Sequence, residues 1–243
     1  MDDKEQKFKT YRSLSNMHNF RLRLFAEGIL TGILAGIVIS FFRFALSEME
    51  YLRGALYNRL WVSDWSINAC WFAVLIAIAY ILHKLNCIEP MAAGSGIPQV
   101  KGAILGLMKM RWLHILWVKL TAGIIGIGAG LSLGREGPSI QLGAVTAQGV
   151  SRLMGRTRME ERYLLTSGAS AGLAAAFNAP LAGVIFALEE LHRNFSIMVL
   201  LPSMAAAFTA TIISRAIFGR ATIFDIPDLQ LLPISYYGIV ILV

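Results

Sequence analysis

Charged residues are scarce in this chain of 243 residues: they make up 15% of it, whereas about 25% is usual in a soluble domain. Hydrophobic residues reach 56%, against roughly 45–50% in soluble domains. An apolar excess spread along the whole chain excludes both a disordered protein and a soluble domain with one anchor. We therefore expect an all-α integral membrane protein, because a lipid-exposed backbone must satisfy its own hydrogen bonds.

Cysteine and histidine are also rare, with two and four residues. Cys70 and Cys87 lack a CxxC or other metal-ligand spacing, and the histidines stand apart from one another, so we expect neither a metal site nor a cofactor. The net charge of +7 would suggest nucleic acid as the partner of a soluble protein. In a membrane protein it indicates basic loops facing the cytoplasm, and we expect no nucleic-acid partner.

A signal peptide is lacking at the N-terminus, where no short apolar core leads to a cleavage site. Instead, residues 1–26 contain six Lys and Arg side chains. The positive-inside rule predicts that this basic segment is cytoplasmic. Residues 27–243 are expected to form one transmembrane domain, in a multi-pass protein of the inner or plasma membrane.

Six charge-poor stretches follow the basic segment and predict the membrane-embedded helices. The first, second and fifth stretches contain few helix breakers and are expected to be ordinary spanning helices, the first extending toward Leu46. The last stops inside an apolar run without a polar anchor, so we expect a truncated sequence or the first half of a longer chain. The stretches are 28–42, 65–82, 120–134, 163–188, 195–214 and 229–243.

Glycine, proline and asparagine interrupt the apolar pattern at three places, 94–98, 134–138 and 178–180. These interruptions predict discontinuous helices. Irregular backbone at membrane depth is tolerated only around a cavity or inside protein, and transporters build their substrate sites from such half-helices.

The first interruption, GSGIP, places a serine and a glycine before an Ile-Pro pair that is typical of a helix start. Its hydroxyl and the unpaired N–H groups of the first turn would attract an anion, helped by the helix dipole. Taken alone, the motif is more simply explained by an ordinary N-cap with glycines for the turn. The residues are Gly94, Ser95, Gly96, Ile97 and Pro98.

The second interruption, GREGP, presents a carboxylate at the start of a helix. Glu136 would occupy the place of an external anion, and protonation would remove its charge, so it is a candidate for both a gate and a proton carrier. A structural ion pair between Arg135 and Glu136 is the alternative. The motif consists of Gly134, Arg135, Glu136, Gly137 and Pro138.

Three further charged residues lie in or next to apolar segments. Lys119 would be costly as an unpaired ammonium in lipid, so it is expected to face a polar interior, as a structural group or as a source of positive potential on an anion path. Glu189 and Glu190 follow the third interruption. They form either a solvated helix end or the mouth of a proton path.

Taken in order, GSGIPQVKGA, GREGPSIQLG and FNAPLAGVIFALEE resemble the CLC family of chloride channels and chloride/proton antiporters. The resemblance implies a fold of tilted, discontinuous and re-entrant helices built from two halves of inverted topology, of which this chain resembles the first. The later family motif GxFxP and the pore tyrosine have no counterpart here.

The resemblance also implies roles for individual residues. The segments 94–98 and 134–138 would be the first two parts of an anion selectivity filter, in which Ser95 coordinates chloride from the cytoplasmic side. Glu136 would be the external gate and proton glutamate, and Glu190 the internal proton-transfer residue. Gln99 and Lys101 depart from the family, where relatives often have acidic residues.

These roles imply chloride/proton antiport with a glutamate gate, by a homodimer with one pore per subunit. Chloride, protons and the lipid bilayer would be the partners. The alternatives are a passive voltage- or proton-gated chloride channel, a fluoride-selective relative and an inactive half. A membrane enzyme with Glu136 and Glu190 as acid and base lacks a supporting nucleophile or metal cluster, so we expect no enzyme.

Overall fold

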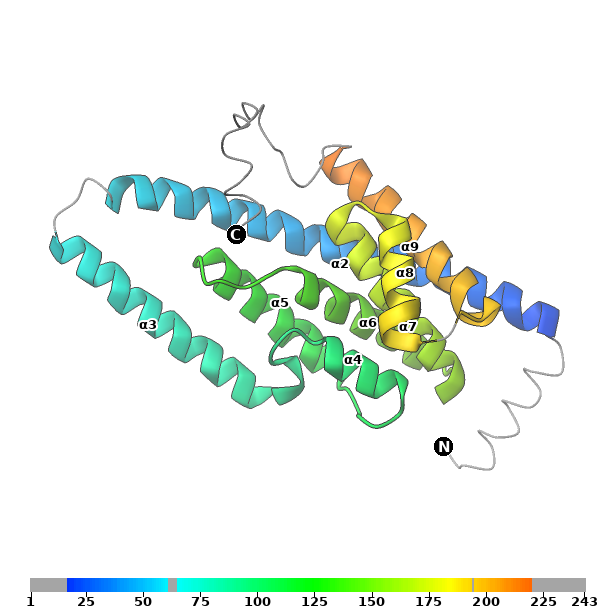
Figure 1. Ribbon diagram of the computed structural model, residues 1–243. Coiled ribbons are helices and arrows are strands. Elements are labelled where there is room, and N and C mark those ends of the chain that lie inside the picture. Colours follow the sequence, from blue (N-terminus) through cyan, green and yellow to red (C-terminus); the bar gives the residue numbers. More distant parts are fainter. Residues whose placement is uncertain (1–16, 61–64, 194, 220–243) are drawn as a thin grey trace, which may run out of the picture.

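The computed structural model describes residues 17–60, 65–193 and 195–219, and every regular element in these ranges is helical (Figure 1). The expected all-α class is therefore confirmed. A 3-10 turn (Pro90–Ala92) precedes α4, and a π-helical turn (Ala187–His192) follows α8. The helices are α2 (Met17–Leu60), α3 (Trp65–Ile88), α4 (Ile97–Ile104), α5 (Trp112–Gly128), α6 (Glu136–Leu153), α7 (Arg158–Phe177), α8 (Pro180–Phe186) and α9 (Ile197–Phe218).

Three of these helices are long and apolar enough to cross a bilayer, over Asn19–Arg59, Ile67–Ile88 and Ile197–Phe218. They correspond to the first, second and fifth predicted stretches. However, α2 is much longer than predicted: its 44 residues rise about 66 Å, whereas a hydrocarbon layer is about 30 Å thick. The helix continues past Arg43 because the mixed polar sequence that follows contains no proline, so α2 must tilt or extend beyond the lipid.

Two other predicted stretches, 120–134 and 163–188, are broken, as expected. The helix α5 begins at Trp112 and ends at Gly128, so the stretch 120–134 is only partly helical. The stretch 163–188 divides where Asn178 adopts a left-handed conformation (φ 58°) and Pro180 starts a new helix. The stretch 229–243 lies outside the described residues.

Close backbone packing holds the helices together, as α2 runs beside α9 and α6 beside α7 (Figure 1). A Cβ built on Gly32 would lie 2.5 Å from the carbonyl oxygen of Ala206, and one built on Gly143 would lie 2.2 Å from that of Gly168. Such small residues let helices approach without side chains between them. Within these helix pairs, the small residues therefore serve packing inside the chain.

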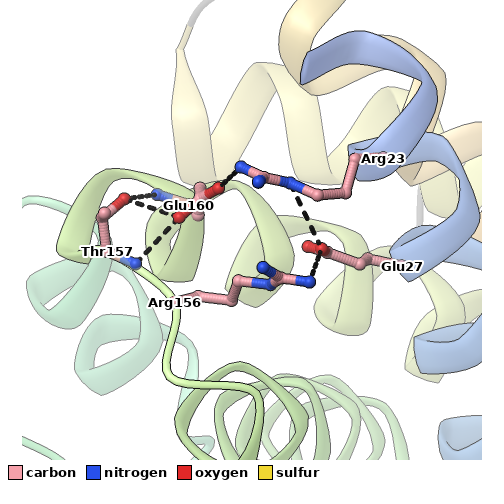
Figure 2. Close-up of polar contacts among 5 residues, drawn as sticks. All are labelled: Arg23, Glu27, Arg156, Thr157 and Glu160. Atoms are coloured by element: carbon pink, nitrogen blue, oxygen red, sulfur yellow. Dashed lines mark hydrogen bonds and ion pairs between the residues drawn. The ribbon is translucent and has the colours of Figure 1, made fainter. Parts of the chain in front are cut away.

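A network of charged side chains ties the start of α2 to the connection between α6 and α7 (Figure 2). Oε1 of Glu27 lies 2.6 Å from Nη2 of Arg156 and 3.7 Å from Nε of Arg23, so it forms ion pairs with both. Arg23 in turn pairs with Glu160. Thr157 and Glu160 form a capping box at the start of α7. The two carboxylates are nearly fully buried, so the network fixes α2 against α7.

Candidate functional site

A cavity of about 570 Å³ lies between the loop before α4, the inner face of α5 and the start of α6. Ser95 of the first motif, Lys119 of α5 and Glu136 of the second motif all line it. The structure therefore brings both predicted filter segments to one cavity, although they are some 40 residues apart in the sequence.

The segment 91–94 runs from the 3-10 turn into the loop before α4, and polar side chains from three helices bind its carbonyl groups. A backbone carbonyl that accepts no bond from another backbone group needs a different donor. Four successive carbonyls accept a hydrogen bond from a side chain, and these bonds hold the loop against the helices. The hydrogen bonds run from Gln141 Nε2 to Met91 O (2.7 Å), from Lys119 Nζ to Ala92 O (2.9 Å) and Gly94 O (2.6 Å), and from Gln99 Nε2 to Ala93 O (3.0 Å).

Lys119 is the charged member of this set, and its residue is only 4% exposed. Within the described ranges its ammonium group has no carboxylate partner; it binds two backbone carbonyls instead. The structural role considered for Lys119 is thus observed. The same side chain also lines the cavity, so its positive charge lies beside any anion held there.

Ser95 occupies a tight turn immediately before α4. Its Oγ accepts a hydrogen bond from the N–H of Ile97 at 3.3 Å, and Pro98 lies in the first turn of the helix, as predicted. The N-cap itself is Gly96, with φ 86°, a conformation that favours glycine. Ser95 is therefore not an ordinary N-cap; it precedes the cap and lines the cavity.

The two motifs touch through a glycine. A Cβ built on Gly137, the second residue of α6, would lie 2.5 Å from the carbonyl oxygen of Ser95. Likewise, one built on Gly96 would lie 2.4 Å from Oε1 of Gln141. The start of α6 can approach the loop this closely only because neither position has a side chain.

Glu136 is the first residue of α6 and is exposed to the cavity. Its carboxylate folds back over Gly134, where a Cβ would lie 2.1 Å from Oε2. Among the ion pairs of the described residues, none joins Arg135 to Glu136, so the alternative of a structural pair is not observed. Arg135 is the N-cap of α6.

Glu190 lies apart from this cavity, in the π-helical turn after α8. Its Oε1 accepts from Nζ of Lys101, on α4, at 2.7 Å. The hydrogen bond and the positive charge of Lys101 lower the pKa of Glu190, and the charge of Arg193 adds to the effect. Glu136 and Glu190 therefore do not share one pocket as an acid and base pair would.

Several of these contacts were not predicted from the sequence. Gln99 and Gln141 are isolated amides next to glycine-rich motifs, a weak signal that only the loop geometry makes meaningful. Lys101 was noted as a departure from the family, but its partner was not. In the part of the chain that the structure describes, no group of three or more His, Cys, Asp or Glu could hold a metal ion.

Comparison with known proteins identifies relatives of this chain. A family model described as "Voltage gated chloride channel" matches residues 72–243. The H(+)/Cl(-) exchange transporter ClcA of Vibrio cholerae is 34% identical over 224 residues, which cover 88% of this chain and 47% of the relative. The chain thus spans about half the length of the curated relatives it matches.

Solved structures agree with this comparison. A slow cyanobacterial Cl⁻/H⁺ antiporter matches with a TM-score of 0.73 and 31% identity, over 90% of this chain and 52% of that one. A CLC-type fluoride/proton antiporter matches with a TM-score of 0.66 over 92% of this chain and 54% of that one; at 24% identity it supports the fold alone. The chain belongs to the voltage gated chloride channel (CLC) family.

Proposed function

We propose that this chain forms part of a chloride/proton antiporter with a glutamate gate. The observation that carries the proposal is the single cavity lined by Ser95, Lys119 and Glu136, at the point where Gly137 packs on Ser95. Relatives named as H(+)/Cl(-) exchange transporters support the same activity. The family context favours transport over an enzymatic reaction.

The mechanism would be competition for one electropositive region. The start of α6 carries a partial positive charge from its helix dipole, and Lys119 adds a full charge beside the loop. Both chloride near Ser95 and the ionised carboxylate of Glu136 are attracted there. Protonation of Glu136 removes its charge, so the side chain releases the site to the anion and carries a proton outward.

Glu190 would supply the internal end of the proton route. It lies outside the cavity, next to Lys101 of α4. Separate routes for the two ions suit an antiporter, because the proton then reaches Glu136 without passing through the anion site. A passive channel would need no such internal carboxylate.

The same function implies a membrane location, a topology and an oligomeric state for the chain. Residues 27–243 would belong to the transmembrane domain of a longer protein in the inner or plasma membrane, with residues 1–26 in the cytoplasm. That protein would act as a homodimer. Chloride and protons would be its only transported partners, with fluoride as the alternative anion.

The test uses the full-length protein in liposomes. An imposed chloride gradient should drive protons uphill, and Glu136→Gln should abolish proton movement while chloride still flows. Glu48→Gln, which removes an exposed carboxylate of α2, is the matched control and should leave coupling intact. Chloride flux without proton counterflow in the unaltered protein would contradict antiport and favour the channel, and repeating the assay with fluoride separates the two anions.

A further inference from the structure

The ion pair between Lys101 and Glu190 joins α4, the helix that starts in the GSGIP motif, to the π-helical turn that contains Glu190. Lys101 lies on α4, four residues after Ile97, so about 6 Å of helix separates it from the start of the helix. The Lys101 side chain is 23% exposed and that of Glu190 is 47% exposed, with 2.7 Å between Nζ and Oε1. Each group is therefore within reach of solvent, and each is held by the other.

The charges around Glu190 are mostly positive. From α4 comes Lys101, and directly after the π-helical turn comes Arg193. The helix α8 has no ionisable residue, and the basic residue of α9, Arg215, binds Asn178 instead. Glu189, in the same turn, is exposed and is the acidic neighbour.

The helix α7 packs against this region at His192, which belongs to the same π-helical turn as Glu190. Nδ1 of His192 lies 3.1 Å from Oγ1 of Thr166, and its ring packs beside that of Tyr163. Burial and the charge of Arg162 lower the pKa of His192, so the ring is neutral at physiological pH. It therefore adds no charge, and Lys101 remains the cation in direct contact with Glu190.

We propose that Lys101 is a positioning residue that holds Glu190 as an ionised carboxylate beside α4 and thereby sets the internal pH at which Glu190 takes up protons. This inference rests on the proposed antiport function. Gln99, two residues earlier on the same helix, binds the loop at Ala93, so α4 connects the loop at one end to the internal glutamate at the other.

The direction of the effect follows from the charge. A neighbouring cation stabilises the ionised form, so Glu190 is protonated only at a lower pH than a free glutamate. Proton uptake from the inside is then slow at neutral pH and increases as the internal pH falls. Neutralising Lys101 should raise the pKa of Glu190 and shift the pH dependence of proton flux toward alkaline values.

The experiment measures proton and chloride flux by the full-length protein in liposomes while the internal pH is varied. In Lys101→Gln, the midpoint of the proton-flux profile should rise by about half a pH unit, a size suited to a partly exposed pair. That shift gives about a threefold larger proton flux above the midpoint. Lys101→Arg keeps the charge and should keep the original midpoint.

The matched control is Lys109→Gln, which removes an exposed lysine from the connection between α4 and α5 and should not move the midpoint. If the glutamine variant at 101 does not give folded protein, Lys101→Met, of similar length, replaces it. An unaltered protein that couples protons to chloride, together with a neutral variant at 101 that keeps its midpoint, overturns this inference alone. Absence of proton coupling in the unaltered protein overturns the proposed function as well.

Discussion

Gly137 is the residue on which the contact between the GSGIP and GREGP motifs depends. Its Cα faces the backbone of Ser95, and a Cβ there would lie 2.5 Å from the Ser95 carbonyl oxygen and 2.9 Å from its Cα. The neighbouring atoms are backbone atoms of a loop held by several hydrogen bonds, so they cannot rotate away as a flexible side chain would. Glycine at 137 is thus a steric requirement of the site.

We expect Gly137→Ala to separate α6 from the loop. Overpacking a tight contact costs about 1–3 kcal/mol, and the displaced loop would no longer present Ser95 to the cavity. The thermal unfolding temperature of the purified full-length protein and its chloride flux should both decrease.

The matched control for this substitution is Gly54→Ala, because Gly54 is also helical and a Cβ there meets no atom within 4 Å. This change should leave flux intact and stabilise α2 by about 0.5–1 kcal/mol. Equal stability and flux in Gly137→Ala and the unaltered protein would contradict the close contact.

Single residues were predictable to different degrees. The glycines and prolines of both filter motifs indicate turns and helix starts, because their backbone preferences are local. Partners distant in the sequence were not predictable in this way. The bonds from Gln141 to the loop and from Lys101 to Glu190 depend on how whole helices are placed, which no local pattern specifies.

At the scale of elements, the charged network of Figure 2 joins helices that are far apart in the sequence. Glu27 of α2 stands between Arg23 on its own helix and Arg156 at the end of the α6–α7 connection. Removal of Glu27 takes away the carboxylate that Arg156 pairs with, whereas Arg23 keeps Glu160; losing one partner of a buried pair costs more than the pair itself contributes. The network therefore resists any sliding of α2 along α7.

We expect Glu27→Ala to destabilise the protein by about 2 kcal/mol, less than the ~3–5 kcal/mol for a fully buried pair, because Arg23 is 37% exposed. Thermal unfolding followed by size-exclusion chromatography measures the change. The same substitution at Glu50, whose side chain is 76% exposed beside Arg53, should cost about 0–1 kcal/mol. Similar losses in the two variants would show that burial of Glu27 does not matter.

The elements themselves were predictable where apolar residues are continuous and poorly where they are not. Hydropathy indicated the three long helices, because a spanning helix needs an uninterrupted apolar run. It did not indicate that α2 reaches Leu60, because helix continuation through polar sequence leaves no hydropathy signal. The π-helical turn around Glu190 also has no sequence signature.

At the scale of the whole molecule, the length and exposure of α3 fit a helix that crosses the membrane once. The segment Ile67–Ile88 has no buried residue, and its 22 residues rise about 33 Å, close to the thickness of a hydrocarbon layer. Cys70 and Cys87 are both exposed and lie near its opposite ends, about 26 Å apart along the axis.

We expect these two thiols to lie on opposite sides of the membrane. In a full-length protein whose other cysteines are replaced by serine, a charged, impermeant maleimide should label Cys70 from outside and Cys87 from inside, if residues 1–26 are cytoplasmic. A protein without either cysteine is the control for background labelling. Labelling of both thiols from the same side would contradict a membrane-crossing α3.

The hydrogen bonds that hold the loop at 91–94 also affect which ions can approach it. A cation approaching the carbonyl oxygens at 91–94 would find each of them already bound to an ammonium or an amide group. It would also meet the charge of Lys119 directly behind those oxygens. We therefore expect the charge of Lys119 behind this loop to disfavour cations near Ser95.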